Sequence, residues 1–172
     1  LCGTMSVGKT TLVNALKELK QFKDYNFATE RSQHLMSLGI PLNTDSTLKG
    51  QTVFLAERCG ELMHDNIITD RTILDVMAFT MNAKSIPYQD KEAFETYASE
   101  FIREYDHIFY ISPHGLEIED NGIRETDEHY RDLIDFTITT LIKRHGHKAG
   151  TIEKISGSTE ERIQQILNVT KL

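Results

Sequence analysis

GTMSVGKT, residues 3–10, matches the P-loop pattern G-x-x-x-x-G-K-[ST] at every fixed position. In such a loop a polyphosphate meets a row of backbone N–H groups, and side chains in place of Gly3 and Gly8 would obstruct the turn and the approach of the phosphates. Lys9 supplies a positive charge for the β and γ phosphates, and the Thr10 hydroxyl can coordinate Mg²⁺. The sequence therefore predicts a site for ATP and Mg²⁺.

An apolar helical pattern follows this loop at once. Leu12, Leu16 and Leu19 form one stripe of a helix, whose N-terminal N–H groups and positive dipole end would face the anion. A P-loop normally follows a buried parallel strand, yet only Leu1 and Cys2 precede this one, so we expect a first strand before residue 1. The residues expected to bind the phosphates of ATP are Gly3, Ser6, Val7, Gly8, Lys9, Thr10 and Thr11.

The composition is that of a globular, soluble protein. The 172 residues are 39% hydrophobic and 26% charged, which predicts a single domain spanning residues 1–172. No apolar run approaches the roughly 20 residues that cross a bilayer, so no membrane partner is expected. Cys2 and Cys59 lie far apart in sequence, which indicates neither a disulfide framework nor a zinc site and favours a reducing cytoplasm.

The charge and the histidines also exclude two classes of ligand. A formal net charge of -7 argues against general nucleic-acid binding, because affinity for a strand depends on neutralising its phosphates. His145 and His147 are interpreted as solvated loop residues rather than metal ligands, since no cysteine or carboxylate cluster accompanies them at ligand spacing. A homodimer is compatible with the sequence only on the base rate for soluble enzymes.

Strand-like and helix-like segments alternate along the rest of the chain. We expect strands over residues 25–29, 66–69, 107–112 and 150–156, and helices over residues 9–19, 48–63, 72–81, 89–104 and 127–144, with a last helix beginning at residue 158. Thr72 with Asp75, and Ser158 with Glu161, have the spacing of capping boxes. Strands separated by long helices predict an α/β fold, a three-layer αβα sandwich around a parallel sheet.

Polar residues follow three of the predicted strands. Because ligands of such sheets gather at the carboxyl ends of the strands, where the P-loop also lies, these residues are site candidates. They are Glu30 and Arg31 after the first strand, Asp70 and Arg71 after the second, and Arg124 with Arg131 in a lid-like polar segment over about residues 113–131.

Each candidate has a role in phosphoryl transfer, which requires alignment, Mg²⁺ and neutralisation of charge. Glu30 is expected to accept a proton from the acceptor hydroxyl, to orient that hydroxyl, or to bind a water of Mg²⁺. Asp70 is expected to position Mg²⁺ or its water shell together with Thr10. The alternative for every candidate is an ordinary surface ion pair.

The arginines are expected to bind phosphate. Arg31 and Arg71 can grip an acceptor phosphate through a bidentate guanidinium contact, and Arg124 with Arg131 can close over the transferring phosphates. Arg58 shares a helical face with Leu55 and needs a partner, either in an acceptor site or in a structural salt bridge.

Four stretches together resemble the P-loop nucleoside and nucleotide kinases: GTMSVGKTTL, TER, DRTILDVMAF and EDNGIRETDEHYRD. Within that group the pattern is similar to the compact domain that includes the ribosylnicotinamide kinase module, and more distantly to thymidylate and deoxynucleoside kinases. The resemblance implies Mg²⁺-dependent transfer of the ATP γ-phosphate on a Rossmann-like three-layer sandwich. It implies P-loop roles for Lys9 and Thr10, matches Asp70-Arg71 to the family's D-R pair, and matches Arg124 to its lid arginine.

Several acceptors stay open. The arginines near the expected acceptor site favour a deoxynucleoside monophosphate such as TMP over a bare nucleoside, with a ribosylnicotinamide-type nucleoside kinase as the second interpretation. A P-loop switch or motor is a different class, although the chain has no N-K-x-D stretch for reading guanine. A polynucleotide kinase is a third class, which the acidic net charge disfavours.

Overall fold

The computed structural model describes residues 1–29, 32–116 and 127–172. Helices and strands alternate along these residues, with four short 3₁₀ helices between them. In chain order the elements are α1 (Lys9–Lys17), η1 (Lys20–Phe22), β1 (Asn26–Ala28), α2 (Ser32–Ser37), η2 (Asn43–Asp45), α3 (Leu48–Glu61), β2 (Ile67–Thr69), α4 (Ile73–Asn82), α5 (Tyr88–Ala98), η3 (Ser99–Glu104), β3 (His107–Ile111), α6 (Glu128–His145), η4 (Gly146–Lys148), β4 (Thr151–Ile155) and α7 (Thr159–Thr170).

The strands form two parallel pairs that the first two residues join. β1 pairs with β2, and β3 pairs with β4, each in parallel. Between them, the Leu1 nitrogen donates a hydrogen bond to the Thr69 carbonyl at 2.7 Å, and Cys2 bridges Tyr110 in parallel. The carboxyl ends of β2 and β3 therefore flank the start of the P-loop.

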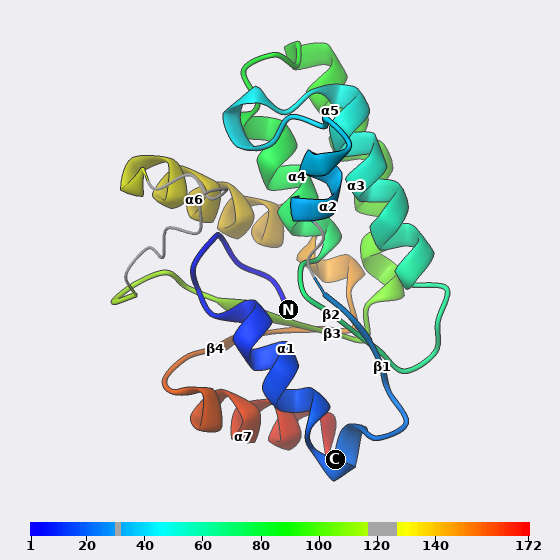
Figure 1. Cartoon of the computed structure of the whole chain (residues 1–172), viewed down its shortest axis with the longest axis vertical. Helices are drawn as coiled ribbons and strands as arrows, with labels where there is room; N and C mark the ends of the chain where they lie inside the picture. The colour runs from blue at the N-terminus through cyan, green and yellow to red at the C-terminus, as the bar shows by residue number, and fades with distance from the viewer. Residues whose placement is uncertain (30–31, 117–126) are drawn as a thin grey trace.

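Helices cover both faces of these strands. Figure 1 shows α1 and α7 on one side of the strands and α3, α4, α5 and α6 on the other. The α1–α7 side has a core of buried residues that includes Leu12, Leu16, Phe109 and Ile166, and the opposite side has a larger core centred on α4 and α6. The predicted three-layer α/β architecture is confirmed.

The predicted elements are found with small differences at their ends. All four strands are present and one or two residues shorter than expected, because only these residues pair with a neighbouring strand. Both predicted capping boxes are present, at Thr72 with Asp75 and at Ser158 with Glu161. The helix expected over residues 89–104 is instead α5 followed by the tighter turns of η3, and α2 and η2 were not predicted.

A cavity of about 660 Å³ lies between β2 and β3, on the side of Leu1 away from the P-loop. Residues that line it include Leu1, Leu16, Ile68, Tyr105, Phe109 and Ile166.

Candidate active site

The P-loop has the backbone conformation of an anion-binding turn. Gly3, Ser6 and Gly8 have positive φ angles of 151°, 57° and 80°. A Cβ at Gly3 would lie 2.6 Å from the carbonyl oxygen of Ile111, so glycine is required here by close packing on β3. Gly8 is exposed and precedes the first turn of α1, where free N–H groups and the positive end of the helix dipole favour a phosphate.

Lys9 lies inside this loop. Its side chain is 6% exposed, and Nζ donates hydrogen bonds of 2.7 Å to the carbonyl oxygens of Gly3 and Thr4. Burial lowers the pKa of Lys9, as does the nearby charge of Arg71, while Asp75 and Asp70 oppose this shift. The ammonium group is thus held at the loop, and a phosphate would add the charge that its environment lacks.

Asp75 connects the P-loop to α4. One carboxylate oxygen accepts a hydrogen bond from the Gly3 N–H at 3.1 Å, and the other accepts hydrogen bonds from the Thr72 N–H and hydroxyl at 2.7 and 2.8 Å. The side chain is fully buried. A single carboxylate therefore fixes the position of the P-loop relative to the turn that carries Asp70 and Arg71.

Thr10 and Asp70 form the pair that the sequence predicts for Mg²⁺. The Thr10 hydroxyl donates a hydrogen bond of 2.5 Å to Asp70 Oδ2. Asp70 Oδ1 is buried and has no hydrogen-bond partner in the described part of the chain. A hydroxyl and a carboxylate with a spare oxygen suit Mg²⁺, which prefers one or two protein oxygens together with phosphates and water. The described residues contain no cluster of three or more His, Cys, Asp or Glu side chains that would suit another metal.

Arg71 follows Asp70 in a strained backbone conformation. Its φ angle is 105°, and its N–H donates a hydrogen bond of 3.1 Å to the Leu1 carbonyl. The guanidinium lies over the Phe79 ring, 5.0 Å from the ring centroid, as in a cation–π contact. Strain of this kind in a residue other than glycine is typical of functional sites and is retained only where surrounding contacts impose it.

Arg58, for which two roles were open, lies in a buried salt bridge. Its side chain is 3% exposed and donates a hydrogen bond of 2.6 Å to Glu61 and one of 3.3 Å to the Asp70 carbonyl. Through its hydrogen bond to the Asp70 carbonyl, the guanidinium stabilises the chain where it leaves β2.

A small cavity of about 40 Å³ lies beside Arg71. Its walls are apolar side chains, including Phe54 and Phe79, and polar side chains from α2, η2 and α3. Gln51 is 3% exposed, and its side chain lines the cavity. The Ser46 hydroxyl is buried and has no hydrogen-bond partner among the described residues. Buried polar groups are normally hydrogen-bonded, so this cavity, which we name the acceptor pocket, has the character of a site for a ligand with polar groups. The lining residues are Ser32, Leu42, Asn43, Ser46, Gln51, Phe54, Arg71, Val76 and Phe79.

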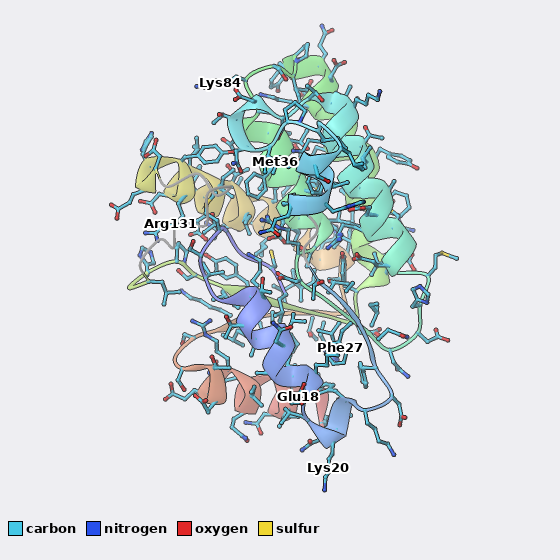
Figure 2. All side chains as sticks on the ribbon, viewed as in Figure 1. Glu18, Lys20, Phe27, Met36, Lys84 and Arg131 are labelled. Atoms are coloured by element: carbon cyan, nitrogen blue, oxygen red, sulfur yellow. The ribbon has the colours of Figure 1, made fainter. Side chains whose placement is uncertain are left out.

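Arg131 links the start of α6 to the P-loop. Figure 2 labels it between α6 and the loop that leads into α1. Its carbonyl accepts a hydrogen bond from the Thr4 hydroxyl at 3.2 Å, and its Nη1 donates one of 2.7 Å to the Leu116 carbonyl. The predicted residues Glu30, Arg31 and Arg124 lie outside the described residues, as does most of the expected lid.

A family model described as an AAA domain matches residues 1–162. The chain belongs to this family. The match includes the P-loop, Asp70, the acceptor pocket and the start of α7, so the AAA domain comprises the whole candidate site. No curated protein matches the chain.

Solved structures show the same fold in an enzyme. The chain is similar to the deoxyadenosine kinase of M. mycoides with bound dCTP, with a TM-score of 0.67 and 17% identity over 99% of this chain and 96% of that one. A second structure of that kinase, with the products dCMP and a flexible dCDP bound, has a TM-score of 0.65 and 18% identity over 98% of this chain and 96% of that one. The resemblance to P-loop nucleoside and nucleotide kinases is thus confirmed at the level of the fold.

Sequence reasoning missed three features of the site in this AAA domain. The sequence did not predict the contact of Asp75 with Gly3, because the capping box with Thr72 already accounted for a carboxylate at position 75. Ser46 gave no pattern, since it lies in a loop next to a 3₁₀ helix. Arg162 on α7 donates a hydrogen bond to the Val7 carbonyl of the P-loop. It had a usable signal in the sequence, since it stands four residues before Ile166 on the apolar face of an amphipathic helix.

Proposed function

We propose that this AAA domain is an ATP-dependent phosphotransferase that transfers the γ-phosphate of ATP to a small nucleoside or nucleoside monophosphate. One observation carries the proposal. Asp70 pairs with Thr10 of the P-loop, and the next residue, Arg71, lines the acceptor pocket. The expected phosphate donor and the expected acceptor therefore adjoin the same turn, as direct transfer requires.

On the donor side, the P-loop amides and Lys9 would hold the phosphates of ATP, with Arg131 nearby on α6. Thr10 and Asp70 would hold Mg²⁺, which supplies charge stabilisation for the phosphates when bound. Lys9 would exchange its hydrogen bonds to the Gly3 and Thr4 carbonyls for bonds to phosphate oxygens. Glu30 is the proposed base for the acceptor hydroxyl, and Arg124 the proposed lid cation.

On the acceptor side, Gln51 is placed to read the edge of a base. A carboxamide offers one acceptor and two donors, which match the adjacent donor and acceptor groups of a nucleobase. Phe54 and Phe79 would contact the faces of the ring.

A bare nucleoside is the acceptor best supported by this arrangement. Arg71 packs on Phe79 and forms part of the pocket wall, rather than extending as an unengaged cation. The deoxyadenosine kinase fold agrees with a nucleoside acceptor. A deoxynucleoside monophosphate such as TMP, the acceptor that the sequence favours, becomes the second candidate, and a guanidinium beside the pocket would suit its phosphate.

The test is ADP release measured by a coupled assay over deoxynucleosides, ribonucleosides, ribosylnicotinamide and the corresponding monophosphates. We expect turnover that requires both Mg²⁺ and one class of acceptor, and that disappears in Lys9→Ala. ATP hydrolysis that no small acceptor stimulates, but that a protein or DNA stimulates, would contradict the proposal and favour a switch or motor.

A further inference from the structure

The inner face of α7 carries a buried cation. Arg162 and Ile166 are four residues apart and therefore share a helix face, and they are 7% and 2% exposed. Ile166 packs with Leu12 and Leu16 of α1 in the core of that side. An apolar side chain at position 162 would extend this interface, so the packing alone does not call for a charge.

Arg162 instead contacts the P-loop. Its Nη1 donates a hydrogen bond of 2.8 Å to the carbonyl oxygen of Val7, between Ser6 and Gly8. The same nitrogen would lie 3.2 Å from a Cβ at Gly8. The guanidinium therefore fixes the loop at the point where its backbone turns into α1.

This guanidinium has no acidic partner in the described part of the chain. No Asp or Glu carboxylate described in the structure forms an ion pair with Arg162, and its Nε is buried without a hydrogen-bond partner there. Burial lowers the pKa of Arg162, which shows the direction of the desolvation cost. Arg58, equally buried, has Glu61 at 2.6 Å. A buried charge without a counter-ion destabilises the protein that contains it.

We propose that Arg162 is a positioning residue of the donor site, and that the polyphosphate bound by the P-loop is the anion that compensates its charge. The guanidinium acts through the Val7 carbonyl, which it holds so that the neighbouring N–H groups converge on the phosphates. Its charge, close to Gly8, adds to the attraction for an anion at the start of α1. The inference rests on the proposed binding of ATP and adds α7 to the nucleotide site.

The test compares Arg162→Met, Arg162→Lys and the wild-type protein with MgADP as the probe. Calorimetry gives the Kd for MgADP, and thermal unfolding without nucleotide gives the Tm. Steady-state kinetics give the KM values for ATP and for the acceptor. Arg144→Met is the matched control, because Arg144 is an exposed arginine in the last turn of α6, where it pairs with Glu95 of α5.

We expect Arg162→Met to bind MgADP about tenfold more weakly, with a raised KM for ATP and an unchanged KM for the acceptor. Its Tm without nucleotide should equal or exceed that of the wild type, because an apolar side chain replaces a buried charge that has no acidic partner among the described residues. Arg162→Lys should recover most of the affinity, and Arg144→Met should leave the Kd unchanged.

An unchanged Kd for MgADP in Arg162→Met would overturn the inference. A weaker Kd accompanied by a Tm several degrees lower would also overturn it, since a packing defect would then explain the result. If the wild-type protein itself does not bind MgADP, the proposed function fails. Normal binding by both the wild type and Arg162→Met leaves that function intact and removes only the role of Arg162.

Discussion

The donor and acceptor sides of this site are built in different ways. The donor side is formed by one short stretch, residues 3–10, in which the glycines and the lysine are neighbours in the sequence as well as in the fold. The acceptor pocket collects residues 32 to 79 from α2, η2, α3, α4 and the turn after β2. A local motif can therefore specify the chemistry of phosphate binding, whereas the identity of the acceptor depends on packing between distant segments.

Two carboxylates join these sides. Asp70 bonds to Thr10, and Asp75 bonds to Gly3, while both residues flank the turn that carries Arg71. A substitution on the donor side should change only the kinetic constants for ATP, and one on the acceptor side only those for the acceptor. A substitution that breaks a hydrogen bond of Asp70 or Asp75 should change both. The predictions below test that separation, beginning with the largest effect.

Lys9→Ala should have the largest effect, on the donor side alone. Loss of the cation that is proposed to bind the transferring phosphates should lower kcat/KM for ATP by about 10²- to 10³-fold or more. Circular dichroism should show an unchanged fold. Retained turnover would refute the assignment of the P-loop, and a lost fold would call for Lys9→Met as a second variant.

Asp70→Asn should weaken the binding of Mg²⁺ at the residue that joins the donor side to the acceptor side. The amide can keep the hydrogen bond with Thr10 but loses the negative charge expected to hold Mg²⁺. The Mg²⁺ concentration for half-maximal rate should rise by about 10- to 100-fold. A titration of rate against Mg²⁺ measures this change, and an unaltered midpoint would contradict the proposed metal pair.

Gln51→Leu should affect the acceptor side alone. Loss of the carboxamide that we propose to bind the base should raise the KM of the acceptor about tenfold, which corresponds to about 1.4 kcal/mol. The KM for ATP should not change. If the KM for ATP rises in parallel, the two sides are not separate.

Glu95→Gln should leave both sides unchanged and alter only stability. Although burial raises the pKa of Glu95, hydrogen bonds from His145 and Arg144 lower it below its ordinary value of 4.5. Its contribution to stability is therefore present above pH 4.5 and is lost as pH falls through the lower pKa of the folded state.

At pH 7 this variant should unfold about 2–4 °C below the wild type, as expected for about 1 kcal/mol in a chain of this size. The difference should shrink below pH 4.5. Thermal unfolding at pH 3.5 and 7 measures both values, and an equal difference at the two pH values would exclude the ion pair as its cause.

The same contrast explains what the sequence could predict. The P-loop, the four strands and the capping box of Thr72 with Asp75 depend on short-range patterns, and each is present in the structure. The pairing of Thr10 with Asp70 followed from the rule that ligands gather at the carboxyl ends of parallel strands. Contacts between residues far apart in the sequence could not be predicted from such patterns, because they depend on how the helices pack.

Arg162 and Ser46 illustrate that limit. Arg162 reaches Val7 across 155 residues of sequence, and its role depends on the packing of α7 against α1. Ser46 lines the acceptor pocket only because the segment before α3 folds over it. Among the described residues, no helix has the length and apolar character needed to cross a membrane.

Calorimetric titration with a non-hydrolysable ATP analogue, with Mg²⁺ and then with EDTA, tests the central claim most directly. The wild-type protein should bind the analogue with Mg²⁺, bind it at least tenfold more weakly with EDTA, and lose binding in Lys9→Ala. Absence of binding to the analogue in both conditions, by protein with a native circular dichroism spectrum, would contradict the account.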